Sequence, residues 1–175
     1  STFKWDGHIY GIANWNQDQT LSTAFKASCV WCYQELALRI GQEKYRGYIK
    51  QSNFGQLDKQ LDTTSFWLDG SLQISALEQV DFIKNLVQHR LHFDKNAYQT
   101  LREIMLVEKT PNYSLWAKTG WATRVNHKVG WYVGYVQTSE DTWIFVLNMD
   151  LSNAKGLPLR QEIVLAALKS KGIIK

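Results

Sequence analysis

Three side chains far apart in the sequence have the chemistry to act together on an anionic acyl substrate. Ser28 supplies a hydroxyl, Lys118 an ammonium group and Arg160 a guanidinium group. A serine hydroxyl can relay a proton, a lysine supplies positive charge, and an arginine can bind a carboxylate through parallel hydrogen bonds. These residues are therefore candidates for one site, provided that the fold brings them together.

Each of the three residues also has an ordinary structural explanation. Lys118 begins a Lys-Thr-Gly string at the end of an expected strand, where a solvated lysine is common. Ser28 lies at the junction of two helical patterns, where a hydroxyl can cap a helix. Arg160 falls in the first turn of the last expected helix, where it could form a surface salt bridge. The helix dipole disfavours positive charge there, which slightly favours a functional role.

The two cysteines, Cys29 and Cys32, form a Cys-x-x-Cys string. A redox motif would need a thioredoxin-like strand before it, and a zinc site would need a second pair of Cys or His ligands. We expect both cysteines to be small buried residues on one helix, with a local disulfide in an oxidising compartment as the alternative. The histidines, expected at the surface and without zinc-site spacing, are His8, His89, His92 and His127.

The elements that must position these residues change character along the chain. Ser75 and Glu78 form a capping box that starts a helix, and Gly130 and Gly134 within one strand predict a close backbone approach or a bulge. Apolar spacing predicts helices, and runs rich in Trp, Tyr, Val and Ile predict strands. The expected helices are Thr20–Gly41 (with an interruption near Ser28), Gln42–Gln51, the helix that starts at Ser75, Lys95–Glu108 and Pro158–Gly172. A loop is expected over Asn53–Gln73. The expected strands are Trp116–Trp121, Gly130–Gln137 and Trp143–Asp150. This order predicts an α+β fold, with helices packed on an antiparallel sheet, in a single domain spanning residues 1–175.

Composition excludes several classes of protein. The chain is 45% hydrophobic and 21% charged, unlike a disordered or fibrous protein. Its net charge of +4 comes from scattered basic residues without a phosphate-tracking cluster, so we expect no nucleic-acid partner. No apolar run is long enough to cross a bilayer, and Gly-x-Ser-x-Gly, His-Glu-x-x-His, Walker and dinucleotide-binding patterns are absent.

Nine short strings occur in order along nearly the whole chain, from Phe3 to Ile174. They are Phe3-Lys4-Trp5-Asp6-Gly7, Ser28-Cys29-Val30, Tyr33-Gln34-Glu35, Phe66-Trp67-Leu68-Asp69-Gly70, Ile74-Ser75, Lys118-Thr119-Gly120-Trp121, Gly130-Trp131-Tyr132-Val133-Gly134, Asn148-Met149-Asp150 and Leu157-Pro158-Leu159-Arg160. In this order and spacing, the sequence resembles the class D (oxacillinase-type) serine β-lactamases.

The resemblance implies a fold like that of β-lactamases and penicillin-binding transpeptidases. It implies hydrolysis of β-lactam antibiotics through an acyl-serine intermediate, with a carbamylated lysine as the base and no metal. Ser28 would relay a proton to the departing lactam nitrogen, and Lys118 would supply positive charge beside it. Trp67 would hydrogen-bond the carbamylated lysine, which an apolar environment keeps neutral enough to react with carbon dioxide.

The resemblance also implies which residues bind the substrate. Thr119 and Arg160, with Gly120 in the same Lys-Thr-Gly string, would hold the substrate carboxylate. The backbone N–H of Trp121 would form half of an oxyanion hole.

The sequence departs from the family pattern at two places. The usual Tyr-Gly-Asn is Phe54-Gly55-Gln56 here, so no polar role is assigned to Phe54. The family's nucleophile and base form a Ser-x-x-Lys pair on a buried helix, and Ser1 and Lys4 match that spacing. We interpret this match as coincidental, because a turn signal follows Lys4 directly and the family's N-terminal portion is expected to be absent from this chain. The alternative is that Ser1 and Lys4 are the true pair and that residues after Lys4 are missing.

Three hypotheses of function follow. The first is a β-lactamase, periplasmic or secreted, whose signal peptide is not in this chain. The second is a β-lactam sensor or penicillin-binding domain that is acylated without turnover, and the third is an inactive fragment that lacks the nucleophile. The sequence favours the first, since Trp67 is the residue expected to support the carbamate. It does not predict an oligomeric state.

Overall fold

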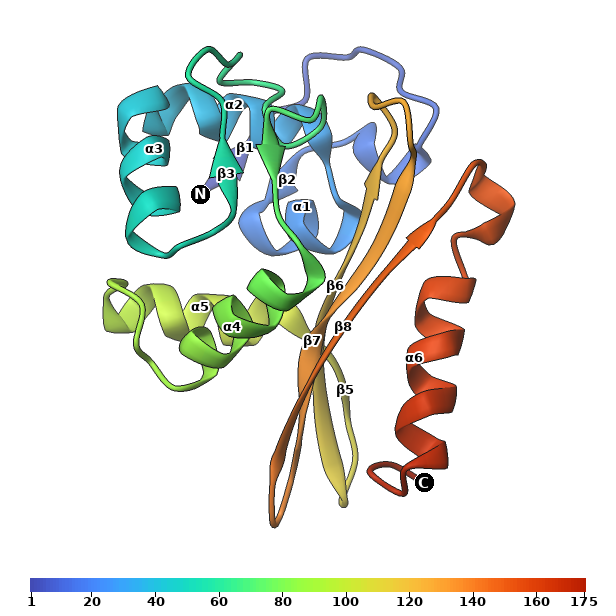
Figure 1. The fold of residues 1–175 in the computed structure, drawn as a ribbon. Coiled ribbons are helices and arrows are strands. Elements are labelled where there is room, and N and C mark those ends of the chain that lie inside the picture. The colour runs from blue at the N-terminus through green and yellow to red at the C-terminus, as the bar shows by residue number, and fades with distance from the viewer.

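A computed structural model describes residues 1–175 and has the α+β fold that the sequence predicts. Its main sheet is antiparallel with the order β5-β6-β7-β8, in which the strands are Leu106–Lys109, Tyr113–Ala122, Val129–Thr138 and Thr142–Asp150. Helix α6 (Leu159–Ser170) lies along one side of the sheet, while α4 (Ala76–Val87) and α5 (Lys95–Met105) lie on the other (Figure 1). The remaining elements are α1 (Leu21–Ala27), α2 (Val30–Ile40), α3 (Gln42–Gln51), the short ribbons β1–β2 (Thr2–Phe3, Gln19–Thr20) and β3–β4 (Gln56–Leu57, Leu72–Gln73), and the 3-10 turns Ala13–Trp15 and Ala154–Gly156.

The sheet separates two hydrophobic cores. Successive side chains of a strand point to opposite faces, so Leu115 and Trp116 of β6 belong to different cores. Leu115 packs with Val164 and Leu168 of α6. Trp116 stacks on Tyr135 of β7, with 4.9 Å between ring centroids, and shares its core with residues of α4 and α5. The sheet is therefore buried on both sides, and both helical layers are needed to cover it.

Some predicted boundaries agree with the structure and others do not. The capping box at Ser75 and Glu78 is present and begins α4, and α3 covers the predicted range Gln42–Gln51. The helix predicted over Lys95–Glu108 ends at Met105, because the following residues form β5 and pair with β6. Helical spacing of apolar residues does not reveal this change, since strand pairing depends on a segment later in the chain.

The close approach predicted from the strand glycines is confirmed. A Cβ atom on Gly134 would lie 2.0 Å from the carbonyl oxygen of Trp116 in the neighbouring strand. Only glycine fits there, which allows β6 and β7 to pair over their full lengths, from Tyr113 opposite Thr138 to Ala122 opposite Val129.

Strand β8 forms one edge of the main sheet, and β5 forms the other. None of the residues of β8 is fully buried, and Trp143 is 45% exposed. The segment 142–149 carries no charged side chain. None of the helices is both long and apolar enough to span a membrane.

Candidate active site

Ser28 lies between two helices in a conformation that few residues adopt. It ends α1 with φ 49° and ψ 46°, in the left-handed region, and its N–H donates to the carbonyls of Ala24 and Phe25. Glycine and asparagine are the usual residues at such a helix end, because a Cβ atom is unfavourable there. The hydroxyl of Ser28, rather than its backbone preference, therefore explains why serine suits this position.

The Ser28 hydroxyl faces Lys118, which lies in the middle of strand β6. The Lys118 Nζ donates to Ser28 Oγ at 2.5 Å and to the Thr119 carbonyl oxygen at 2.7 Å. The same Nζ lies 5.4 Å from the ring centroid of Phe25, so the end of α1 covers the lysine with one polar and one aromatic group. Lys118 lies within β6 and not at its end, because the strand continues to Ala122.

Two positive charges lie close together in this site. Burial, which is the larger cause, and the charge of Arg160 together lower the pKa of Lys118 from 10.5 to about 8. Burial also lowers the pKa of Arg160. Neither cation has a carboxylate partner, since the ion pairs of the structure join other residues. An anionic ligand would therefore find uncompensated positive charge here.

Arg160 lies in the first turn of α6, as predicted, but it forms no surface salt bridge. It is 9% exposed, and its guanidinium donates to the carbonyl oxygens of Leu157 at 2.9 Å and Gly120 at 2.6 Å. Its Nη2 has no hydrogen bond in the structure, and no buried side-chain nitrogen or oxygen lacks a partner, so Nη2 is accessible to solvent. The arginine is thus held by two carbonyls, and the Nη2 amino group is left for a ligand.

The sequence did not identify Gly130 as a site residue, yet the side chain of Arg160 packs directly against this glycine. A Cβ atom on Gly130 would lie 3.0 Å from Arg160 Cδ and 2.8 Å from Leu151 Cδ2. The absent side chain lets the arginine stem cross β7 closely. A glycine within a strand predicts that another group approaches the backbone closely, but it does not indicate that this group is Arg160.

The remaining predicted substrate-binding residues adjoin these groups along β6. Gly120 contributes the carbonyl that holds Arg160. The half-buried hydroxyl of Thr119 makes no hydrogen bond and is accessible to solvent. The Trp121 indole donates to the carbonyl of Leu151 at 3.1 Å, tying the end of β6 to the segment after β8. The oxyanion-hole role of the Trp121 backbone N–H stays a prediction.

The structure does not join Trp67 to this cluster. The Trp67 ring packs edge-on against Phe66, with 5.0 Å between centroids, and its indole N–H makes no hydrogen bond. The nearby Gly70 approaches Val125 of the β6–β7 connection, since a Cβ atom there would lie 3.2 Å from Val125 Cγ1. The loop that carries Trp67 therefore borders the hairpin that follows Lys118, while the predicted role of Trp67 stays a prediction.

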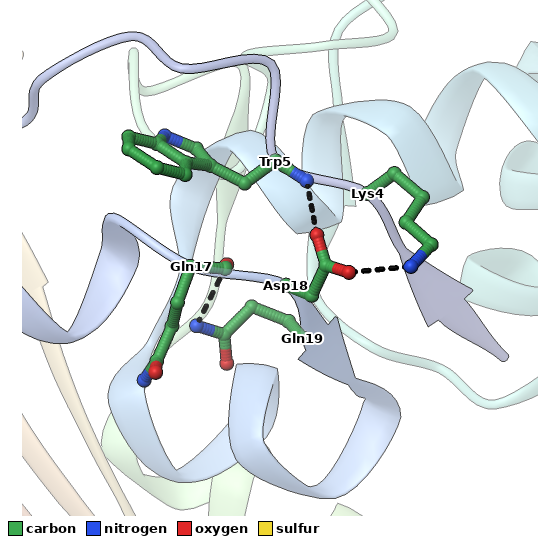
Figure 2. Close-up of polar contacts among 5 residues, drawn as sticks. All are labelled: Lys4, Trp5, Gln17, Asp18 and Gln19. Carbon is green, nitrogen blue, oxygen red and sulfur yellow. Dashed lines mark hydrogen bonds and ion pairs between the residues drawn. The ribbon is translucent and has the colours of Figure 1, made fainter.

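Ser1 and Lys4 do not form a helical pair. Thr2 and Phe3 belong to strand β1, and the side chain of Lys4 is 84% exposed. Figure 2 shows that Asp18 binds both the Lys4 amino group, at 2.5 Å, and the Trp5 backbone N–H, at 2.9 Å. The hydrogen bond that Lys4 donates to the Asp18 carboxylate raises the pKa of Lys4. Ser1 and Lys4 therefore do not share a helical face in this structure, and the interpretation that the Ser-x-x-Lys match is coincidental stays a prediction.

The expectation for the cysteines is wrong in one respect. Cys29 and Cys32 are both completely buried, as expected, but they are joined by a disulfide. Cys29 is the N-cap residue of α2 rather than a helical position, and this places the two side chains one turn apart. The four histidines are exposed, as predicted, and the structure contains no cluster of three or more His, Cys, Asp or Glu side chains suited to a metal ion.

The cluster can bind an anion and move a proton. Lys118 and its hydrogen-bonded partner Ser28 form a path from the amine of a half-buried lysine to an exposed hydroxyl. With a pKa of about 8, the amine exchanges protons readily near neutral pH. Arg160 and Thr119 offer free hydrogen-bonding groups beside it. This combination suits a substrate with a carboxylate and a leaving group that must be protonated.

Comparisons with known proteins identify one family. Residues 1–169 match the sequence profile of the penicillin binding protein transpeptidase domain. Over 98% of its length, the chain is 41% identical to β-lactamase OXA-48 from Klebsiella pneumoniae and 34% identical to β-lactamase OXA-10 from Pseudomonas aeruginosa. It covers 65% and 66% of those relatives, so it spans about two thirds of their length. The solved class D β-lactamase YbXI from Nostoc superimposes with a TM-score of 0.94 at 37% identity, over 98% of this chain and 73% of that one. The chain belongs to the class D β-lactamase family.

Proposed function

We propose that this protein acts on β-lactams and that the Ser28, Lys118 and Arg160 cluster binds and protonates them. The observation that carries the proposal is the 2.5 Å hydrogen bond between Lys118 Nζ and Ser28 Oγ, beside an arginine that has no anionic partner. Arg160 and Thr119 would bind the carboxylate of the substrate. The proton that the departing lactam nitrogen needs would pass from Lys118 through the Ser28 hydroxyl.

Hydrolysis in this reaction requires an acyl-serine and a group that activates water. The resemblance implies a carbamylated lysine for that step, and a carbamate forms on a neutral, buried amine. Lys4 does not fit this requirement, because it is exposed and paired with Asp18. We therefore derive no step through a carbamate on Lys4.

The exposure of Lys4 and its pairing with Asp18 favour a second candidate function. A protein that binds β-lactams through the carboxylate-binding and proton-relaying groups, but does not deacylate, would not turn them over. A β-lactam sensor or a penicillin-binding domain behaves in this way.

A chromogenic cephalosporin and intact-mass measurement separate these functions. Steady hydrolysis that is lost in Lys118→Met and kept in Lys109→Met supports the hydrolase, since Lys109 is an exposed lysine at the far end of the sheet. A penicillin adduct or saturable penicillin binding without turnover supports the second function. If the protein shows no turnover, no adduct and no saturable binding at millimolar penicillin, both are wrong.

We also propose that the protein works in the periplasm or outside the cell. The Cys29–Cys32 disulfide supports this location, because disulfides persist in oxidising compartments and are rare in the reducing cytosol. Isolation of the protein from periplasmic and cytosolic fractions, with its thiols blocked at lysis, tests the location and the disulfide together.

A further inference from the structure

The first turn of α2 is closed by a covalent bond where two other helices of this chain use hydrogen bonds. Helices α1 and α4 each begin with a capping box, in which the N-cap residue and the residue three positions later bond each other's backbone N–H. At α2, Cys29 is the N-cap residue and makes no side-chain capping bond. Its disulfide joins it to Cys32, at the same spacing of three residues. The disulfide thus links covalently the two positions that a capping box would link by hydrogen bonds.

Ser28 directly precedes this covalent turn. Its left-handed backbone, with φ 49°, is unfavourable for a residue with a Cβ atom and persists only where neighbouring structure enforces it. On one side, the end of α1 holds it, because the N–H groups of Ser28 and Cys29 both donate to the carbonyl of Ala24. On the other side, Cys29 is fixed by its bond to Cys32. The disulfide is therefore one of two restraints on the Ser28 backbone.

The disulfide is anchored in a small core beneath the serine. Cys29 and Cys32 are completely buried in a cluster with Phe3 and Ala24. The indole of Trp15 packs on this cluster and donates to the carbonyl of Ala27 at 3.0 Å, one residue before Ser28. A change in the first turn of α2 therefore acts on the α1–α2 junction.

The same junction covers Lys118. Phe25 and Ser28, the two groups of α1 that lie over the Lys118 amine, are separated by one helical turn at the end of that helix. Burial is the main reason why the Lys118 pKa is about 8 rather than 10.5. If the end of α1 moves, water reaches the amine.

We propose that the Cys29–Cys32 disulfide positions the Ser28 hydroxyl over Lys118, so that reduction of this bond releases Ser28 from its left-handed conformation and uncovers the lysine. The reductant is a dithiol: its two electrons and two protons break the S–S bond and yield two cysteine thiols, while the dithiol closes to its own disulfide. The effect on β-lactam chemistry rests on the function proposed above. The effect on Lys118 itself does not.

The Lys118 pKa is the direct readout. We would follow the ¹³Cε resonances of ¹³C-labelled lysines from pH 6 to 11 in the oxidised protein and in the protein reduced with dithiothreitol, with Lys118→Met to assign the signal. We expect the Lys118 pKa to rise from about 8 by about 2 units on reduction. At pH 8 the neutral fraction of the amine would then fall from about half to about 1%. The double variant Cys29→Ala/Cys32→Ala should behave like the reduced protein.

The control is a variant that weakens a different helix cap. Ser75→Ala removes the capping hydroxyl of α4 and should lower stability without changing the Lys118 pKa. The proposal is wrong if the pKa is the same in the oxidised and reduced proteins, if Ser75→Ala raises it equally, or if both the reduced protein and the double variant are unfolded by circular dichroism at 10 °C. Turnover of a chromogenic cephalosporin is measured separately, so that a protein inactive in both redox states refutes the proposed function and leaves the pKa result to decide this inference.

Discussion

The low pKa of Lys118 makes the stability of the folded protein depend on pH in a direction unusual for a lysine. Below pH 8 the amine is protonated in both states, and the folded state carries a buried charge. Between pH 8 and 10.5 the unfolded chain still binds this proton while the folded protein has released it, so stability rises with pH. The whole difference corresponds to about 3 kcal/mol, of which about 2 kcal/mol develops between pH 7 and 9.5.

Urea unfolding at pH 7 and pH 9.5, followed by tryptophan fluorescence, measures this contribution. Lys118→Met removes the titrating group, so its free energy of unfolding should rise with pH by about 2 kcal/mol less than that of the parent protein. Lys109→Met should keep the parent's pH dependence. Burial raises the pKa of Tyr33 to about 12, but this tyrosine is present in the parent and in the variant, so its contribution cancels in the comparison. Equal pH dependence in the parent and Lys118→Met would refute the reasoning that burial and Arg160 depress this pKa.

Three substitutions test the rest of the site. Ser28→Gly suits the left-handed backbone and removes the hydroxyl, so lactam turnover should fall about 10²- to 10⁴-fold while the urea midpoint stays within error. A loss of turnover accompanied by a lower urea midpoint would contradict a chemical role of Ser28. Arg160→Ala should weaken penicillin binding, measured by calorimetry, about 10- to 100-fold, and unchanged affinity would show that the carboxylate binds elsewhere. Gly130→Ala should cost about 1–3 kcal/mol in urea unfolding, because its Cβ would lie 2.8 Å from Leu151 Cδ2 and 3.0 Å from Arg160 Cδ. Gly47→Ala, in helix α3 with nothing within 4 Å, is its control and should stabilise the protein by up to about 1 kcal/mol; a similar loss in both would contradict the packing argument.

Local patterns in the sequence predict the elements that depend on nearby residues. The capping box at Ser75 and the apolar spacing behind it are sufficient to predict α4, because a helix satisfies its own backbone groups. Strand β5 could not be predicted in this way, since its pairing partner is in β6 and its sequence continues the apolar spacing of α5. The two-stranded ribbon formed by β3 and β4 could not be predicted for the same reason, because Gln56 and Gln73 pair across a long loop.

The site shows the same division between residue types and geometry. The resemblance selected Ser28, Lys118 and Arg160 by type and order, and the structure brings them together. The left-handed backbone of Ser28 and the packing of Arg160 against Gly130 depend on three-dimensional neighbours, which the sequence does not specify. The sequence does not predict the disulfide over free thiols, because a Cys-x-x-Cys string is equally compatible with free buried thiols until the first cysteine is known to be a helix cap.

The outer strand of the main sheet has a consequence for work with this protein in solution. β8 presents unpaired backbone groups along Thr142–Asp150, and between residues 142 and 149 no lysine, arginine or acidic side chain is present to repel an incoming strand. Such edges recruit extended segments from other molecules, with a rate that increases with concentration. Lysine at an outward position is one of the devices by which natural sheets block such pairing, so a single lysine substitution on β8 is a simple means of reducing association of this kind.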